Sequence, residues 1–355
     1  MKIQTALSRA ELTSEAAEAV CREVLAELAG RPVDLAFVFF SPHHAESAES
    51  LVSIVQQQLH PRVLLGCSAE SVIGGAQEVE GQPALCLWAA NFPKTTVTPF
   101  HLRFAQAEDG FRVTGWPEEM PAPATNPSFV IIGEPFTTPI DALLQVLGER
   151  HPRGPAIGGM ASGGHEPGMN RLLFNNTVVE DGVVGLALAG AVRIHAVVSQ
   201  GCRPIGERFM ITQAEQNIIH ELGGKPALDR LREVFAQLSP AEQRQAERAL
   251  HLGIVIDEHK DRFERGDFLI RSLAGADQQT GSIAVGDTVK EGQTVQFQLR
   301  DAASASEDLH ALLTSQRTAQ PAGAPLGALV FSCNGRGQRL FRTPHHDASA
   351  IREEL

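Results

Sequence analysis

The chain has 355 residues, enough for two domains of ordinary size with buried cores. With 30 Lys and Arg against 42 Asp and Glu, its formal net charge of −12 disfavours nucleic acid or an anionic membrane as the main partner, because both need a positively charged surface. A hydrophobic content of 43% with 20% charged residues is typical of a soluble globular protein and excludes a largely disordered chain.

The sequence predicts a cytoplasmic protein. Residues 1–9 lack the long apolar core of a secretory signal, and the most apolar run, residues 182–192, is too short to span a bilayer. The cysteines show no CxxC spacing, which is typical of free thiols in a reducing compartment rather than of disulfides or a zinc site. They are Cys21, Cys67, Cys86, Cys202 and Cys333.

Residues 34–40 form a short, nearly continuous apolar run, which is typical of a strand covered on both faces. The Ser-Pro pair at 41–42 then supplies a capping hydroxyl and a proline suited to the first helical position, and an apolar face with helical spacing follows. The His-Pro pair at 60–61 ends this helix, because proline disfavours helical backbone in the residue before it. A second apolar run at 63–67 completes a strand–helix–strand unit.

The same order of elements recurs about ninety residues later. The strand, the helix start, the helix end and the return strand of this second unit are predicted at 128–133, 138–139, 151–153 and 156–160. A His-Pro-Arg run ends both helices, which favours duplication over a chance likeness of two common βαβ units. Each unit continues into a further apolar strand, at 84–89 and 183–188.

Beyond residue 200 the sequence predicts a hairpin region and two helices, which open near 225–226 and 239–240. Further strands are expected at 252–256, 267–271, 282–285, 294–299 and 328–332, with a helix at about 305–316. This part is therefore expected to reuse the theme of the first. The Thr-Pro-His-His run at 343–346 echoes Ser-Pro-His-His at 41–44, so a helix is expected there. By the earlier pattern a return strand would follow that helix, and the alternative is that the unit ends in a helix.

These elements predict an α/β fold, with mixed sheets, flanking helices and internally duplicated βαβ-containing units in two domains. The first domain is expected at 1–200, with pseudo-repeats at about 34–104 and 128–200. The second is expected at 201–355.

Short motifs carry a family resemblance. Those of the first domain are at 39–44, 66–70 and 158–162, and those of the second are at 203–206, 254–257, 265–271, 285–287, 296–301 and 331–337. With them the chain resembles the FIST family, a two-domain intracellular signal-transduction module, over about residues 30 to 350. Family members continue into a Gly-rich strand with a Cys-x-Gly-Glu-type motif, so the second domain is expected to be truncated. The resemblance implies a sensory domain that binds a small molecule, with an amino acid as the usual suggestion, and it implies no reaction.

Two glycine-bearing segments follow predicted strands, where ligands of open α/β sheets bind. Their candidate ligand-binding residues are Gly66, Cys67, Ser68, Glu70, Gly158, Gly159 and Ser162. Glycine there lets backbone N–H groups approach a carboxylate or phosphate. The alternative is that these glycines serve tight turns and close packing. Neither segment contains a dinucleotide or P-loop fingerprint.

Turns of the second domain supply the remaining candidate ligand-binding residues, Arg203, Asn334 and Arg336. A guanidinium is the natural bidentate partner of a carboxylate, and the asparagine amide adds hydrogen bonds of either sense. An ammonium group would be received by Asp257, Glu258, Asp267 or Glu70. Replacing Arg336 by Ala is expected to weaken ligand binding by about 2 to 4 kcal/mol with the fold intact. The alternative is a structural Arg–carboxylate pair between the two domains.

Catalysis has weaker support in the sequence. Cys67 would be a nucleophile with His43 or His44 as its base, but no orienting third group is identifiable and a buried structural thiol is favoured. The adjacent histidines at 43–44 and 345–346 lack the i, i+4 spacing that places two imidazoles on one helix face, so no metal site is predicted. No catalytic residue and no cofactor is predicted either.

The sequence thus predicts a non-catalytic sensory protein whose main partner is a small polar metabolite, an amino acid or a similar small carboxylate. A signalling protein is the expected second partner. One alternative is a protein-interaction platform, in which an unpaired sheet edge accepts a strand or forms a homodimer. The other alternative is a Cys-dependent hydrolase or transferase.

Overall fold

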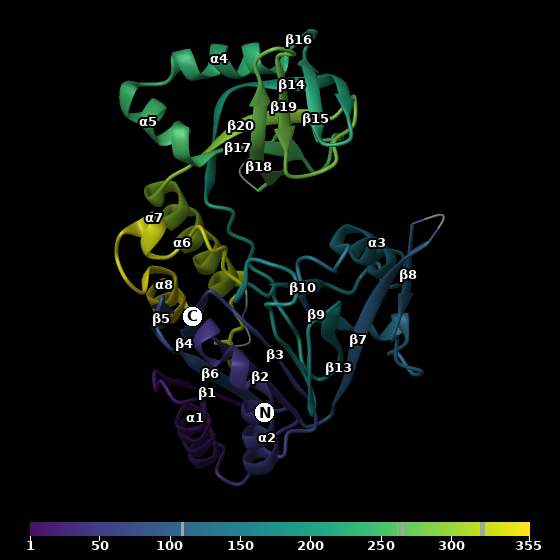
Figure 1. The fold of residues 1–355 in the computed structure, drawn as a ribbon, viewed down its shortest axis with the longest axis vertical. Helices are drawn as coiled ribbons and strands as arrows, with labels where there is room; N and C mark the ends of the chain where they lie inside the picture. Colours follow the sequence, from purple (N-terminus) through teal and green to yellow (C-terminus); the bar gives the residue numbers. More distant parts are fainter. Residues whose placement is uncertain (108–109, 261, 264–265, 320–323) are drawn as a thin grey trace. The chain divides into compact units, whose positions relative to one another are not determined.

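The computed structural model describes residues 1–107, 110–260, 262–263, 266–319 and 324–355, and it divides into two compact units (Figure 1). Unit 1 contains Met1–Ala196, Gln320–Glu353 and Leu355, and unit 2 contains Val197–Ala319 and Glu354. The sequence prediction grouped residues 201–355 together. In the structure, the described part of 324–353 belongs to unit 1, so the chain leaves that unit to form unit 2 and then returns.

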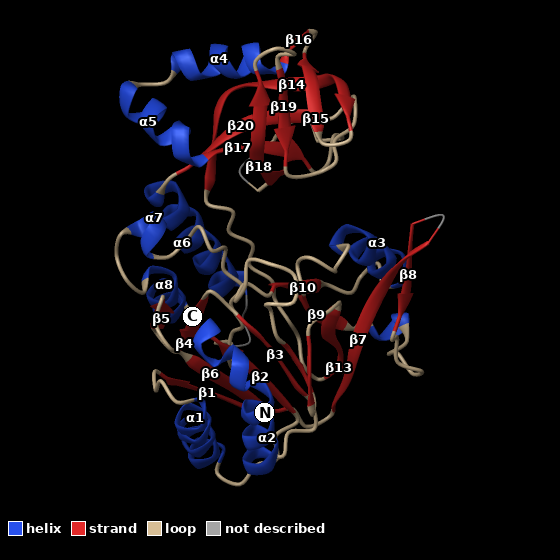
Figure 2. Ribbon diagram, viewed as in Figure 1, coloured by secondary structure: helices blue, strands red, loops and turns tan. Residues whose placement is uncertain are grey.

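Unit 1 is built from two large sheets, the two-stranded sheet β4-β5 and helices (Figure 2). Its elements are β1 (Lys2–Ser8), α1 (Thr13–Leu28), β2 (Leu35–Phe40), the 3-10 helix η1 (Pro42–Ser47), α2 (Ala48–Leu59), β3 (Leu64–Ser68), β4 (Ser71–Gly74), β5 (Gln77–Glu80), β6 (Leu85–Asn91), β7 (Thr95–Ala107), β8 (Gly110–Thr114), the 3-10 helix η2 (Pro123–Thr125), β9 (Ser128–Gly133), α3 (Ile140–Arg150), β10 (Ala156–Met160), β11 (Leu172–Phe174), β12 (Thr177–Val179), β13 (Val183–Gly190), α7 (Gln338–Phe341) and α8 (His346–Glu354). The first sheet has the order β1-β6-β2-β3-β11-β12, and the second has the order β10-β9-β13-β7-β8.

The two sheets of unit 1 pack face to face. Phe37 of the first sheet and Val130 of the second belong to one buried apolar cluster between them. Helices α1 and α2 cover the other face of the first sheet, where Leu51 packs in a cluster with Val38. Helix α3 covers the second sheet through Leu143. Strands β2 and β9 are buried on two faces, which explains their continuous apolar runs. The predicted mixed sheets with flanking helices are confirmed.

The predicted duplication is confirmed by strand order and direction. The first sheet contains β1-β6-β2-β3 and the second contains β7-β13-β9-β10, with the parallel pair last and the other pairs antiparallel in both. The register is also the same, because Ala36 pairs with Leu64 just as Phe129 pairs with Ala156. The two repeats of unit 1 therefore share one backbone pattern, although the described residues between β7 and β9 form β8 and the short 3-10 helix η2 where the first repeat has α1.

Unit 2 is an antiparallel barrel with helices. Its elements are β14 (Cys202–Glu215), β15 (Ile218–Leu222), β16 (Lys225–Pro226), α4 (Ala227–Gln237), α5 (Pro240–Ala249), β17 (Leu250–Val255), β18 (Phe268–Asp277), β19 (Ser282–Val285), β20 (Thr294–Arg300) and α6 (Ala302–Ala319). Strand β14 pairs with both β20 and β15, so the order β14-β20-β17-β18-β19-β15 closes on itself around an apolar core. Closure leaves no free edge among these strands.

Most elements predicted for the C-terminal part are confirmed, including α4, α5, α6 and the helix α8 after the Thr-Pro-His-His run. Two expectations are wrong. Every ladder of unit 2 is antiparallel, so this part does not reuse the βαβ theme. Residues 328–332 form no strand. Their apolar side chains Leu329 and Phe331 instead pack against the cluster between the sheets of unit 1. Arg265 of the 265–271 motif lies outside the described residues.

No helix in the described ranges is both long enough and apolar enough to cross a membrane.

Candidate functional site

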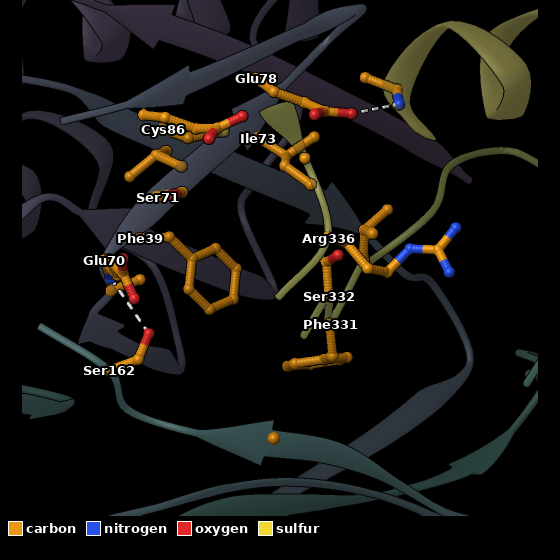
Figure 3. A pocket seen from close by; sticks show the side chains of 18 of the residues that line it. Phe39, Glu70, Ser71, Ile73, Glu78, Cys86, Ser162, Phe331, Ser332 and Arg336 are labelled. Carbon is orange, nitrogen blue, oxygen red and sulfur yellow. Dashed lines mark hydrogen bonds between the residues drawn. The ribbon is translucent and has the colours of Figure 1, made fainter. Parts of the chain in front are cut away.

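Unit 1 contains a cavity of about 990 Å³ where strands of both repeats end (Figure 3). Its lining includes the end of β3 with the β4–β5 hairpin, the end of β10 with Ser162, and residues of the C-terminal segment between Ala328 and Arg352. Strands β1, β2 and β6 and the start of η1 contribute further residues. The two glycine-bearing segments that the sequence singled out therefore meet at one cavity. A volume of this size is at the upper end of what small-molecule sites enclose.

Most of the predicted ligand-binding residues line this cavity. They are Cys67, Glu70, Gly158, Gly159, Ser162, Asn334 and Arg336. Gly66 and Ser68 do not line it, and Arg203 belongs to unit 2. Their binding of a ligand stays a prediction, whereas the convergence of these segments is a property of the fold.

Two hydrogen bonds tie the two strand ends together. The Glu70 N–H donates to the Ser162 hydroxyl over 3.0 Å, and the Ser162 N–H donates to the Ser68 carbonyl over 3.1 Å. Figure 3 shows the first of these bonds beside Phe39. The segment at the end of β3 and the segment after β10 are thus hydrogen-bonded to each other.

For Gly66 and Ser68 the packing alternative describes the structure. A Cβ atom on Gly66 would lie 1.9 Å from the Val38 carbonyl oxygen, so the neighbouring strand leaves no space for a side chain. The buried Ser68 hydroxyl accepts the Arg171 N–H over 3.0 Å, which holds the chain entering β11 against β3.

Arg336 is held by an internal ion pair. Its Nε and Nη2 donate to the two carboxylate oxygens of Asp347 over 2.6 and 2.8 Å, and both side chains are buried. Although burial alone would raise the pKa of Asp347, the hydrogen bonds and charge of Arg336 hold it below its ordinary value. In Figure 3 the Arg336 side chain extends away from Phe39 and Phe331. The expectation of a free guanidinium at this position is therefore wrong.

Arg203 is engaged in the same way within unit 2. Its Nε donates to Asp301 over 3.1 Å and its Nη2 donates to Glu242 over 2.7 Å. The hydrogen bonds from Ser239 and then from Arg203 lower the pKa of Glu242 to about 2. Both arginines thus form structural Arg–carboxylate pairs, but each pair lies inside one unit rather than between two.

The other acidic candidates of unit 2 have local partners. Asp257 accepts the His259 N–H, Glu258 accepts the Thr294 N–H, and Asp267 pairs with Lys260. Only Glu70, of the four carboxylates proposed to receive an ammonium group, lines the described cavity.

Sequence reasoning missed the charged groups that hold the C-terminal segment on the β4–β5 hairpin. Glu78 accepts the Ala348 N–H over 2.8 Å at the start of α8, and Glu80 accepts the Gln338 N–H over 3.0 Å at the start of α7. Carboxylates stabilise helix N-termini because unpaired N–H groups point out of the first turn. Only the Glu-x-Glu pattern of β5 signals these contacts, and it does not reveal which helices it meets.

Arg339 and Arg352 were also missed. Arg339 forms an ion pair with Glu70 at the cavity, and both side chains are partly exposed. Arg352 lines the same cavity and is exposed, and it forms no ion pair within the described part of the chain. These two guanidinium groups are more accessible to a carboxylate than Arg336.

The interior of the cavity is apolar. Phe39 and Phe331 meet edge to face with ring centroids 6.3 Å apart, and Ile73 and Trp88 line the same space. Figure 3 shows Phe39, Ile73 and Phe331 around the middle of the cavity, with Glu70 and Glu78 farther out. The arrangement suits a ligand with an apolar part and a charged end.

Cysteine chemistry has no geometric support here. Burial raises the pKa of Cys67 to about 12, so the thiol stays protonated at neutral pH. His43 contacts the Ser41 hydroxyl over 3.2 Å, and the buried His44 contacts Thr13. Burial also lowers the pKa of His44. Across the described residues, no group of three or more His, Cys, Asp or Glu side chains is placed to hold a metal ion.

Comparison with known proteins gives two family matches. Residues 34–225 match the model of the FIST N domain, and residues 227–355 match the model of the FIST C domain. Uncharacterized proteins from two strains of Mycobacterium tuberculosis are each 40% identical over 355 residues, which is 100% of this chain and 91% of each relative. An uncharacterized protein of Mycobacterium bovis is 40% identical over 329 residues, covering 93% of this chain and 83% of the relative.

Proposed function

Since the chain belongs to the FIST family of sensory and signal-transduction domains, we propose that it is a non-catalytic receptor for an amino acid or a similar small carboxylate. A sensor transmits its occupancy to other proteins, so we expect a signalling-protein partner. Four of the five cysteines are buried free thiols, which supports a reducing, cytoplasmic location.

One observation carries the proposal: strand ends of both repeats and the C-terminal segment meet at a single cavity of about 990 Å³. Gly158 is exposed, and its backbone N–H and carbonyl point away from β9, so they are available to a ligand. Phe39 and Phe331 supply apolar surface for a side chain of the ligand. A few directed polar groups around an apolar interior are typical of small-molecule sites.

The Glu70–Arg339 ion pair suits a zwitterion. An amino acid would place its carboxylate on Arg339 and its ammonium group on Glu70, and so replace one partly exposed pair with two. Partly exposed ion pairs contribute only about 0–1 kcal/mol, so opening this one costs little. Arg352 offers a further guanidinium to a ligand with a second carboxylate.

The test is a thermal-shift screen against amino acids and small carboxylates, followed by calorimetry on each compound that raises the melting temperature. A ligand that binds only the native state raises apparent stability by mass action. Arg339→Gln is expected to weaken binding at least tenfold, because it removes the proposed carboxylate partner. Arg103→Gln is the matched control, since Arg103 forms a similarly exposed ion pair with Asp181 outside the cavity.

A second variant tests the cavity itself. A Cβ on Gly159 would lie 3.2 Å from the Phe331 ring, so Gly159→Leu places a side chain in the cavity and requires that ring to shift by a few tenths of an ångström. Gly148→Leu adds the same side chain on α3, where a Cβ meets nothing within 4 Å. Binding by the Gly148 variant and not by the Gly159 variant is expected. Equal binding by both would move the site elsewhere, and no binding by any compound would count against the receptor proposal.

A further inference from the structure

Strand β10 is an edge strand, and no other strand among the described residues pairs with its outward side. It stands at the end of the second sheet, and Gly158, Gly159 and Met160 are exposed. In the parallel ladder with β9, Phe129 donates to the Pro155 carbonyl and Ala161 donates to the Gly133 carbonyl. Because backbone direction alternates along a strand, residues 155, 157, 159 and 161 point toward β9 and residues 156, 158 and 160 point away.

The equivalent edge in the first repeat is occupied. Strand β3 corresponds to β10 in order, direction and register, and its outer edge pairs antiparallel with β11, where Leu172 stands opposite Cys67. The Ser68 N–H donates to the Arg171 carbonyl over 2.9 Å, and the Leu64 carbonyl accepts the Asn175 N–H over 2.7 Å. This edge therefore binds a short antiparallel strand by its outward backbone groups.

Because the two repeats share one register, the outward backbone groups of β3 have equivalents on β10. Met160 corresponds to Ser68, Gly158 to Gly66 and Ala156 to Leu64. We propose that the edge of β10 binds a short extended peptide, antiparallel to it, in the position that β11 takes beside β3. The inference rests on the proposed function and extends its ligand class from single amino acids to short peptides.

The lining of the cavity indicates which peptide fits. The peptide residue opposite Gly159 corresponds to Leu172, whose side chain is buried in the apolar cluster between the sheets. On the Gly159 side the nearest side chain is Phe331, which belongs to the same cluster, so an apolar side chain is favoured there. A free amino acid cannot span from Ala156 to Met160, whereas five extended residues can.

The carboxylate at this end of β10 agrees with the antiparallel direction. An antiparallel peptide has its amino end beside the carboxyl end of β10, the end that continues into Ser162. The Glu70 backbone is bonded to the Ser162 hydroxyl there, and its carboxylate lines the cavity. A free ammonium group at the amino end of the peptide is therefore complementary to Glu70.

Calorimetry with the pentapeptide Ala-Leu-Ala-Leu-Ala tests the inference. Its central residue would stand opposite Gly158 and exchange both backbone hydrogen bonds with it, whereas the N–H of the first leucine would point away from β10. N-methylation of the central alanine is expected to weaken binding about tenfold or more, since it removes a hydrogen bond and introduces a clash. N-methylation of the first leucine adds the same group and is expected to leave the affinity unchanged.

A protein variant tests the same contact from the other side. Met160→Pro removes an N–H that points away from β9, a position at which an edge strand tolerates proline. It is expected to abolish peptide binding with the melting temperature nearly unchanged, and Met160→Leu is expected to bind as the wild type does. Should Met160→Pro fail to fold, the pair of N-methylated peptides still decides the question.

The outcomes separate the inference from the proposed function. Leucine binding as tightly as the pentapeptide would leave the receptor proposal in place and overturn the peptide inference, as would equal affinities of the two N-methylated peptides. Failure of amino acids and peptides alike would count against both. A dimer in light scattering that Met160→Pro dissociates would show that a second copy of the chain takes this edge, which also overturns the inference.

Discussion

Gly66 and Gly158 occupy the same position in the two repeats of unit 1. Each is the middle residue of its return strand, and each stands opposite a residue of the parallel partner strand, Val38 or Ile131. A Cβ atom would lie 1.9 Å from the Val38 carbonyl oxygen at Gly66 and 1.7 Å from the Ile131 carbonyl oxygen at Gly158. The duplication therefore preserves a close backbone approach as well as the order of strands.

This relationship predicts that Gly66→Ala and Gly158→Ala both destabilise unit 1, by about 2–3 kcal/mol, because the partner strand must move to admit a methyl group. At Gly158 the φ of +153° adds strain for any side chain. Urea denaturation of each variant measures the change in the free energy of unfolding.

Gly148→Ala is the control for this pair. It lies in α3, where a Cβ meets nothing within 4 Å, and alanine in a helix is expected to raise stability by about 0.5–1 kcal/mol. A Gly66 or Gly158 variant as stable as the Gly148 variant would show that the strands separate without cost.

The parts of the fold that follow from local patterns could be predicted from the sequence. Apolar runs at 34–40 and 128–133 mark strands that are buried on two faces, and the prolines at 61 and 152 mark helix ends because their effect is confined to adjacent residues. The segments that line the cavity were found because a repeated unit places equivalent strand ends at equivalent positions.

Contacts between distant residues could not be predicted in this way. Glu70 meets Arg339 across 269 positions, and nothing near either residue indicates the other. The expectation of a free guanidinium at Arg336 was wrong for a similar reason. Asp347 reaches Arg336 only after the chain turns through α7. The segment 328–332 was mistaken for a strand because side-chain burial and strand pairing give the same apolar pattern.

The Arg336–Asp347 pair predicts a structural effect. Their side chains are 9% and 6% exposed, so Arg336→Ala leaves a buried carboxylate without its partner and is expected to cost about 3–5 kcal/mol. Hydrogen exchange should show the loss of protection in α8, and the double variant with Asp347→Ala should be less destabilised than the two single changes added together.

Arg103→Ala is the matched control for that experiment, because it breaks an ion pair whose side chains are 60% and 47% exposed. The expected cost there is about 0–1 kcal/mol. Should Arg336→Ala be as mild as the control, its guanidinium would again be available to a ligand.

Thiol labelling distinguishes the receptor from the Cys-dependent enzyme. Burial raises the pKa of both Cys67 and Cys86 to about 12, whereas Cys333 is exposed. An alkylating reagent at pH 7 should therefore modify Cys333 first and reach the two buried thiols only on unfolding, since the thiolate is the reactive form. Mass spectrometry of the digested protein locates the label. Rapid and selective modification of Cys67 below neutral pH would revive the enzyme alternative.

Glu78 predicts a pH dependence of stability. Burial raises its pKa above the ordinary value of 4.5, so the native state holds a proton up to a higher pH than the unfolded chain does. Because the native state binds more protons in that interval, this group makes stability fall as the pH rises from 4.5 through its native pKa.

Glu78→Gln stays neutral and keeps an oxygen for the Ala348 N–H, so its stability relative to the wild type should increase over the same interval. Denaturation of both proteins from pH 4 to 8 measures the difference, with Glu80→Gln as the control for removing a carboxylate from the same strand. A constant difference across that range would show that the Glu78 proton is held equally in both states.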